Sequence, residues 1–335
     1  MLCSFIIPAY NVSSTIVRCL DSIYTLGLSE QEFEVICIDD CSKDNTISVI
    51  EQYAKQHTNL TLLRQTENHR QGAARNRGVA IAKGKYIVYV DSDDESDKGV
   101  VQALQLAEKQ NLDMVAMHYV NVDDHGNVSE KEAINIEGVF TGVTLQTQYP
   151  YWCTGPVSYV YSVELVKRVN YPFAEDVLFE DSDYVSVHLL HTYRMMYCST
   201  SGYKIHYNSQ STTHTISYKH VADYLLLGTR MLKLYHSFED KNSKYALGIL
   251  EGGSYNIWMA CKRLVKLSSS RDMKLFYERV DQYINRADLL YYSEPSYCWT
   301  WWTKLCLKHK RIAILLILIG SVGYKIMRLI RRTKG

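Results

Sequence analysis

The chain lacks the cysteine spacing of a disulfide-stapled or zinc-binding protein. Its nine cysteines are scattered over 335 residues, and no CxxC pair occurs. This usage favours a reducing compartment. The first ten residues also lack the charged region and long apolar stretch of a signal peptide, because their apolar run stops at Pro8. We therefore expect the body of the chain to lie in the cytosol.

Acidic residues are absent after Glu294, although nine lysines and arginines follow it. Because the whole chain has a net charge of +1, the part up to Glu294 carries −8. A basic tail on an acidic body indicates an anionic membrane surface as a partner. We expect no nucleic-acid partner.

A long apolar run is also missing, since the uncharged stretch 312–324 has only 13 residues. A helix of that length measures about 20 Å, whereas a bilayer core needs roughly 20 residues. Trp299, Trp301 and Trp302 precede the run and bases flank it, which is typical of an interfacial segment. A true span with snorkelling bases and a core helix with basic flanks are the alternatives. We expect 299–335 to associate with a membrane.

Only five prolines punctuate the chain, so its organisation is read from hydrophobic periodicity. Five short apolar runs alternate with helical patterns over the first 120 residues; they are 3–10, 34–40, 60–65, 85–91 and 113–120. Repeated βαβ units predict an α/β fold with a mainly parallel sheet flanked by helices on both faces. Ligands of such sheets bind beyond the carboxyl ends of the strands.

The rest of the chain is predicted to be more helical. Helical patterns occupy 162–169, 180–192, 222–238, 248–267 and 273–292, and a further strand with its loop is expected at 203–214. His188 and His191 are expected on a helix surface, and His206 and His214 as satisfied or exposed side chains. We predict three parts: a catalytic α/β domain at 1–217, a C-terminal helical extension at 218–298, and the tail at 299–335.

The stretch "YIVYVDSDDES", 86–96, places four acids within five positions after an apolar run. Asp91 and Asp93 would lie at the rim of the sheet. They form either a solvated acidic turn or ligands of a divalent cation, since hard cations prefer oxygen ligands.

Polar residues close the other strands at the same rim. Ala9 and Tyr10 end the first apolar run, and Asp39 and Asp40 end the second. One acid there is often a helix cap or turn residue, but it can also bind a base or ribose. Arg75 and Arg77 lie in the helix after the third run, where cations and helix N–H groups suit a phosphate.

Four segments, in order and spacing, resemble the motifs of family 2 glycosyltransferases. They are "SFIIPAYNVSSTIVRCLDSI", "EVICIDDCSKDNT", "GAARNRGVAIAKGKYIVYVDSDD" and "FEDSDYVSVHLL". These are inverting enzymes of the GT-A fold, and many build bacterial surface polysaccharides. The resemblance covers 3 to about 215. Two departures are Cys41, where the family often has glycine, and Gln71-Gly72 before "AARN".

The resemblance implies a role for each matching residue. Ala9, Tyr10, Asp39 and Asp40 would hold the nucleoside of a nucleotide-sugar. Arg75 would lie near the nucleotide or its diphosphate, and Asp91 near the ribose or the metal's waters. Asp93 would ligate Mg²⁺ or Mn²⁺. Asp181 in "FED" would be the catalytic base, although a helix N-terminal acid is the alternative.

The expected function is transfer of a sugar, from a donor expected to be a UDP-sugar, to a hydroxyl of a glycan or lipid-linked acceptor. The expected place is the cytoplasmic face of a bacterial plasma membrane. A sugar nucleotidyltransferase is one alternative, although "PAYNVSS" has no glycine-rich phosphate loop. An inactive membrane scaffold is another, although Asp40, Asp93 and Asp181 are intact. The acceptor determinants are expected between Thr141 and Ser217, around Trp152.

Overall fold

The computed structural model describes residues 1–130, 132–149, 155–208, 217–267, 275 and 278. The chain divides into two compact units, Met1–Ser209 and Gln210–Gly335. The positions of the two units relative to each other are not determined, so each is described by itself.

A single mixed sheet forms the centre of the first unit. Its strand order is β3-β2-β1-β4-β8-β6-β9-β5, and β7 pairs with β6 outside this path. Strands β3, β2, β1 and β4 are parallel, β6 is parallel to β9, and the other pairs are antiparallel. The strands are β1 (Cys3–Ala9), β2 (Phe33–Asp39), β3 (Leu60–Arg64), β4 (Tyr86–Tyr89), β5 (Glu95–Ser96), β6 (Met114–Val122), β7 (Val128–Glu130), β8 (Tyr159–Ser162) and β9 (Met195–His206).

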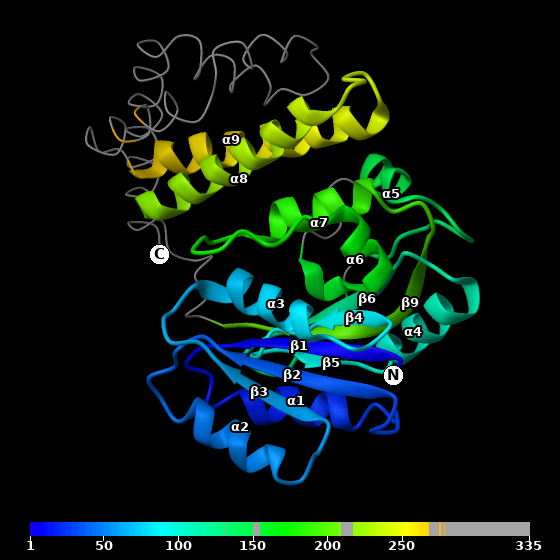
Figure 1. Cartoon of the computed structure of the whole chain (residues 1–335), viewed down its shortest axis with the longest axis vertical. Coiled ribbons are helices and arrows are strands. Elements are labelled where there is room, and N and C mark those ends of the chain that lie inside the picture. Colours follow the sequence, from blue (N-terminus) through cyan, green and yellow to red (C-terminus); the bar gives the residue numbers. More distant parts are fainter. Residues whose placement is uncertain (131, 150–154, 209–216, 268–274, 276–277, 279–335) are drawn as a thin grey trace. The chain divides into compact units, whose positions relative to one another are not determined.

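Helices cover this sheet on both faces. Helices α1 and α2 lie on one face and α3 on the other (Figure 1), as right-handed crossovers on either side of β1 require. The helices of the first unit are α1 (Ile16–Tyr24), α2 (Thr46–Ala54), α3 (Arg70–Ile81), α4 (Gly99–Gln110), α5 (Gly142–Gln148), α6 (Val163–Val169) and α7 (Asp181–Leu190), with a 3₁₀ turn at Pro156–Ser158.

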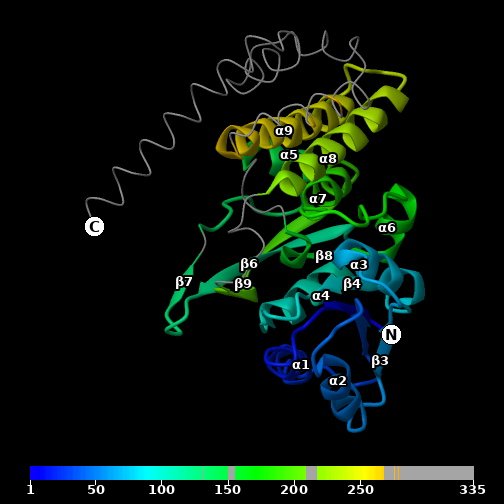
Figure 2. The ribbon, with the colours of Figure 1, turned by 90° about the vertical axis from the view of Figure 1, so that its left-hand side faces the viewer.

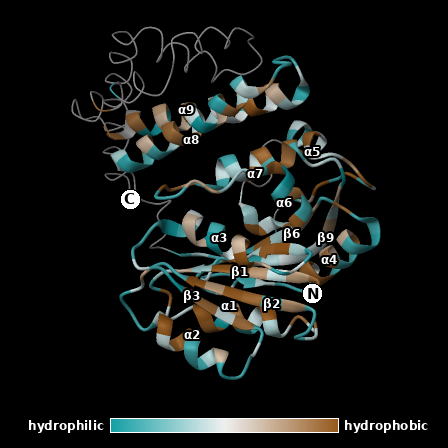
Figure 3. Ribbon diagram, in the orientation of Figure 1, coloured by the Kyte–Doolittle hydropathy of each residue, from teal (hydrophilic) through white to brown (hydrophobic). Residues whose placement is uncertain are grey.

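The core lies between these layers. Strands β1 and β2 are buried at every position, and they are mostly hydrophobic in Figure 3. Helix α1 buries Ile16, Cys19, Leu20 and Ile23, a spacing of three and four residues that defines one helical face. Burial on both faces explains why these strands read as continuous apolar runs.

The strand order reverses between β1 and β4. The chain proceeds from β1 outward to β3 and then returns to the other side of β1. In such sheets the ligand crevice lies beyond the carboxyl ends of the strands that flank the reversal. The residues after β1 and β4 are Tyr10 and the acidic stretch that begins at Asp91.

The prediction of a mainly parallel sheet holds for β3, β2, β1 and β4, and antiparallel pairs complete the sheet. Strand β8 was not predicted, and it separates β4 from β6. The last strand, β9, begins at Met195, before the predicted 203. Strands β6 and β9 run side by side away from the helices (Figure 2), and β7 folds back on β6.

One side-chain placement was wrong. His188 is fully buried, because α7 is enclosed on nearly all sides. Its ring packs on Tyr184, with centroids 4.0 Å apart. Burial lowers the pKa of His188 to about 4. His191 is only partly buried.

The second unit contains two long helices, α8 (Tyr218–Ser237) and α9 (Lys244–Leu267), which pack side by side (Figures 1 and 2). They agree with the helical patterns at 222–238 and 248–267. No helix in the described part of the chain is long and apolar enough to cross a membrane. The predicted helix 273–292, the tail 299–335, Trp152 and His214 lie outside the described residues, apart from Leu275 and Glu278.

Candidate active site

The ends of β1 and β2 meet through the main chain. The Asp40 N–H donates to the Ala9 carbonyl at 2.8 Å. Both Asp39 and Asp40 are nearly fully buried, whereas Tyr10 is 46% exposed. The carboxylate of Asp39 accepts the Ser42 N–H at 3.2 Å. The structure thus brings together the four residues expected to hold a nucleoside, with Tyr10 the most accessible.

Asp40 organises the loop that leads into α3. Its Oδ1 accepts the Gln65 side-chain amide at 2.6 Å and the His69 N–H at 2.8 Å. Burial raises the pKa of Asp40, and these donors oppose the shift. The Oδ1 of Asp40 is therefore occupied by hydrogen bonds within the protein.

Cys41 adopts the left-handed backbone conformation, with φ of 65°. This explains why glycine is common at the equivalent place in the family: a Cβ is disfavoured there. The Cys41 Sγ contacts the Lys43 Nζ at 3.2 Å and the Thr66 carbonyl at 3.5 Å. Asn11, after β1, and Arg70, the first residue of α3, also have positive φ, so strained backbone is concentrated at this rim.

The four clustered acids have different surroundings. Asp91 pairs with Arg75, whose Nη2 lies 2.7 Å from its Oδ1. Two N–H groups fix the main chain: that of Asp94 donates to the Asp91 carbonyl at 3.0 Å, and that of Asp91 donates to the Tyr203 hydroxyl at 2.9 Å. The turn is therefore closed on itself and held by β9.

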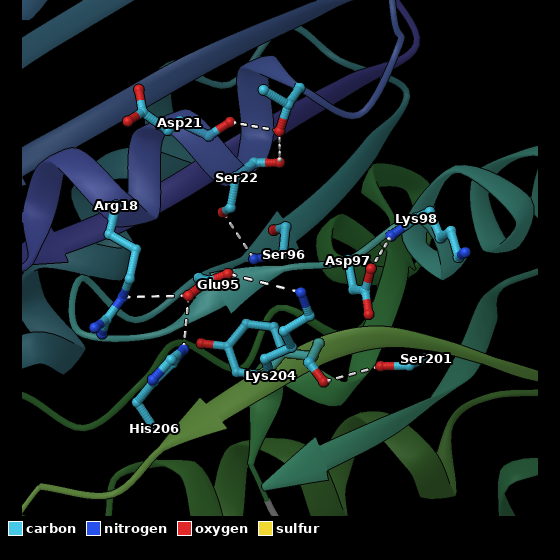
Figure 4. A network of polar contacts seen from close by, with 12 residues as sticks. Arg18, Asp21, Ser22, Glu95, Ser96, Asp97, Lys98, Ser201, Lys204 and His206 are labelled. Atoms are coloured by element: carbon cyan, nitrogen blue, oxygen red, sulfur yellow. Dashed lines mark hydrogen bonds and ion pairs between the residues drawn. The ribbon is translucent and has the colours of Figure 1, made fainter. Parts of the chain in front are cut away.

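Glu95 gathers three bases around one carboxylate (Figure 4). Its Oε1 lies 3.3 Å from the Arg18 Nε and 2.7 Å from the His206 Nε2, and its Oε2 lies 3.8 Å from the Lys204 Nζ. The His206 contact has an ion-pair distance but not the angle of a hydrogen bond. The charge of Glu95 is thus offset by Arg18 of α1 on one side and by Lys204 of β9 on the other.

The surroundings of Asp94 favour the protonated form of its carboxyl group. Burial, together with the charges of Asp91 and Asp93, raises the pKa of Asp94 to about 8. Its Oδ1 accepts the His206 N–H at 2.7 Å. A protonated carboxyl removes one negative charge from the cluster.

Asp93 is the remaining carboxylate. Among the described residues its side chain has no ion pair, and its Oδ2 accepts the Asn208 side-chain amide at 3.1 Å. Burial and then the charge of Asp91 raise the pKa of Asp93, so its charged form lacks compensation. An oxygen ligand that needs a positive charge fits Mg²⁺ or Mn²⁺.

A complete metal cage does not form in the described part of the chain, where no three His, Cys, Asp or Glu side chains converge. A cation held by Asp93 would take its other ligands from donor phosphates and water, as Mg²⁺ usually does.

Arg75 connects the acidic turn to the "FED" segment. Its side chain is 2% exposed, and its Nη1 pairs with Glu180, which is fully buried. The guanidinium also lies over the Phe173 ring, 5.3 Å from its centroid. Although we predicted Arg75 beside the diphosphate, its charge is shared by Asp91 and Glu180. Sequence reasoning missed Glu180, whose only signal was its place beside Asp181.

Asp181 begins α7, next to this buried pair. Burial and then the charge of Glu180 raise the pKa of Asp181 to about 7, while Arg75 opposes the shift. The negative charge of Asp91 also raises the pKa of Asp181. A carboxyl poised near neutral pH is suited to take a proton during a reaction.

The segment before Asp181 is docked on α3. Asn76 holds the Phe173 main chain through two hydrogen bonds, of 3.0 Å to its carbonyl and 2.9 Å from its N–H. The His69 carbonyl accepts the Asp176 N–H at 3.1 Å, and the Asp176 Oδ1 accepts a hydrogen bond from the His69 Nδ1 at 3.0 Å. Arg75 and Asn76 of α3 therefore both hold the segment that contains "FED".

The fold and this arrangement define a class before any comparison is made. A sheet with a reversal between β1 and β4, acids at the ends of β2 and β4, and a buried acid nearby is typical of nucleotide-binding α/β domains. Residues 4–163 match the model of glycosyl transferase family 2. This comparison assigns residues 4–163 of the chain to glycosyl transferase family 2.

Curated relatives share parts of the chain. The poly(ribitol-phosphate) beta-glucosyltransferase of Bacillus spizizenii is 41% identical over 95 residues, which are 28% of this chain and 15% of that protein. The uncharacterized glycosyltransferase EpsJ of Bacillus subtilis is 31% identical over 192 residues, 55% of this chain and 54% of that protein. The chain thus spans about half or less of the length of these relatives.

A solved structure has the same fold. Staphylococcus aureus TarS 1–349, in complex with UDP-GlcNAc, superimposes with a TM-score of 0.65 at 19% identity. The match covers 97% of this chain and 92% of that one. The architecture is therefore GT-A, as the resemblance implied.

Proposed function

We propose that this chain is an inverting, metal-dependent glycosyltransferase that moves a sugar from a UDP-sugar to a hydroxyl of a growing bacterial surface glycan. The observation that carries the proposal is Arg75, which bridges Asp91 at the rim and Glu180 beside Asp181. One buried cation thus links the proposed donor side to the proposed acceptor side. The UDP-GlcNAc complex of TarS supports a UDP-sugar as donor.

The donor is proposed to lie at the rim. Ala9, Tyr10, Asp39 and Asp40 would hold its nucleoside, and Asp91 its ribose. A Mg²⁺ or Mn²⁺ ion held by Asp93 would offset the negative charge that the leaving nucleoside diphosphate gains. Asp91, paired with Arg75, would lie beside it.

The acceptor is proposed to lie beside Asp181. A sugar hydroxyl is a poor nucleophile, so the Asp181 carboxylate would take its proton as it attacks the anomeric carbon. Attack from the face opposite the diphosphate inverts that carbon. The raised pKa of Asp181 makes it a stronger base than an exposed aspartate, while leaving part of it ionised at pH 7.

The tail is proposed to bring this site to a membrane. Its sequence combines three tryptophans, an uncharged run at 312–324 and nine bases, which suits attachment to an anionic surface. A lipid-linked acceptor at the cytoplasmic face would then be found by a two-dimensional search.

A panel of UDP-sugars tests the proposal directly. We expect one or a few of them to release UDP with Mn²⁺ or Mg²⁺, and EDTA to stop the release. A purified, folded chain that neither binds UDP nor hydrolyses any UDP-sugar would contradict the proposal. If EDTA does not affect UDP release, the proposed metal dependence is wrong, but the proposed glycosyltransferase activity stands.

A further inference from the structure

Helix α1 is bonded to the acidic turn from one side. The Arg18 Nη2 donates to the Asp93 carbonyl, the Cys19 Sγ donates to the Asp91 carbonyl at 3.6 Å, and the Ser96 N–H donates to the Ser22 Oγ at 3.0 Å. Residues four apart lie on the same side of a helix, so Arg18 and Ser22 face the turn together. Figure 4 shows Arg18 and Ser22 of α1 above Glu95 and Ser96.

Arg18 differs from the other bases around Glu95. Lys204 and His206 come from β9 and offset the charge of Glu95 from the opposite side. Arg18 pairs with the Glu95 carboxylate and also donates to the main chain of Asp93. It is thus the base that joins the charge cluster to the backbone of the proposed metal ligand.

The turn needs such an anchor because its carboxylates repel one another. Asp91, Asp93, Asp94 and Glu95 all lie within five positions of the chain. A planar guanidinium can hold two acceptors in a fixed arrangement, whereas an ammonium acts as a point charge. Side chains that orient a metal ligand without touching the metal typically change metal affinity 10–100-fold when removed.

We propose that Arg18 is a positioning residue for the metal-binding turn. Its guanidinium fixes the main chain at Asp93 and ties it to Glu95, so that the Asp93 carboxylate is held in place before a divalent cation arrives. This inference rests on the proposed function, because it takes Asp93 as the metal ligand.

The test is a Mn²⁺ titration in the presence of UDP, with free Mn²⁺ measured by electron paramagnetic resonance. We expect Arg18→Met to raise the dissociation constant of Mn²⁺ about tenfold. Arg18→Lys should recover only part of the lost Mn²⁺ affinity, because lysine keeps the positive charge but not the planar guanidinium that holds two acceptors. With an active UDP-sugar, the KM for Mn²⁺ should rise while kcat at saturating Mn²⁺ stays nearly constant.

Lys85→Met is the matched control. Lys85 pairs with Glu108 at 2.7 Å, is about as exposed as Arg18 (49% against 42%), and lies before β4, at the end of the strand opposite Asp91. This variant should bind Mn²⁺ like the parent chain. Thermal melting should show all variants folded, since both side chains are on the surface.

The outcomes separate this inference from the proposed function. If Asp93→Asn loses Mn²⁺ while Arg18→Met binds it as tightly as the parent chain, Arg18 has no positioning role and the metal site stands. If Lys85→Met weakens binding equally, the effect is one of general surface charge and the inference is wrong. A parent chain that binds no Mn²⁺ with UDP overturns both.

Discussion

Arg75 and Asp91 form an ion pair of 2.7 Å in which the arginine side chain is only 2% exposed. The same guanidinium contacts Glu180, which is not exposed at all. The pair therefore links the end of β4 to the start of α7 through α3.

Removing this cation should destabilise the fold. In Arg75→Met the buried charge of Glu180 would lose its partner, a loss that typically costs about 3–5 kcal/mol. Urea denaturation followed by circular dichroism would measure it. Arg77→Met, two residues along the same helix and exposed, should change stability by no more than about 0.5 kcal/mol. Equal, small losses in both variants would show that the Glu180 charge is compensated elsewhere.

Asp181→Asn should abolish sugar transfer and keep UDP binding. The amide cannot accept the hydroxyl proton, and a general base typically contributes about 10²–10⁴-fold in rate. Turnover and calorimetry with UDP would separate the two effects. Asp124→Asn, in the exposed β6–β7 turn, serves as the control. Loss of UDP binding in Asp181→Asn would move this residue to the donor side.

The activity of the parent chain should fall as the pH drops below about 7, the value to which the pKa of Asp181 is raised. The sign follows from the role: only the ionised carboxylate can accept a proton, and it is lost as the pH falls through its pKa. A profile of kcat/KM against pH would show this fall in activity on the acidic side. An acidic limb near pH 4 would mean that Asp181 is not the base, or is not shielded from water.

Asp93→Asn should cut turnover by at least about two orders of magnitude while preserving the fold, because the amide is a poorer ligand for a hard cation. Turnover at increasing Mn²⁺ would measure the effect. Asp97→Asn, four residues further and capped locally by the Lys98 N–H, should retain activity. Unchanged transfer in Asp93→Asn would remove this residue from the metal site.

Cys41→Gly should be more stable than Cys41→Ala by about 1 kcal/mol. Both variants lose the thiol contacts, but only glycine relieves the left-handed φ of 65°. Thermal unfolding of the two variants gives the comparison. An alanine variant of equal or greater stability would show that the loop adapts to a Cβ without strain.

The tail should carry the chain to anionic vesicles. We expect the full chain to float with anionic liposomes, and less so at high salt, because each base near such a surface contributes about 1 kcal/mol that salt screens. A chain truncated after Pro295 should stay in the dense fraction and still bind UDP. If the full-length protein does not float, the membrane proposal is wrong, and 312–324 would instead be buried in a core or an oligomer interface.

The sequence predicted the elements that are buried on both faces. The runs that became β1, β2 and β4 are apolar at nearly every position, and their helices show a regular apolar face. Strand β5 has only two residues, too few for a periodic pattern. Strand β8 is as short as β4 but lies outside the βαβ repeats and pairs antiparallel with β4 and β6. Their pairing depends on distant strands, so local pattern could not place them.

The carboxylates of the site were predictable as types at strand ends, but not their charge states. Arg18 lies 75 residues before the Asp93 carbonyl that it contacts, and Arg75 lies 105 residues before Glu180. Which acid is paired, which is protonated and which is left for a cation follows from these distant contacts. No spacing within "VDSDDES" encodes them.

A missing methyl group sets the separation between the two halves of the site. A Cβ at Gly72 would lie 2.2 Å from the Ala174 carbonyl oxygen, so the chain before "FED" approaches α3 as closely as bare backbone allows. Main-chain contact between Gly72 and Ala174, rather than a side chain, therefore limits how closely the segment that carries the proposed base approaches α3. If the segment around Ala174 were exchanged between family members, this close approach would be preserved only if the residue at position 72 of α3 were exchanged as well.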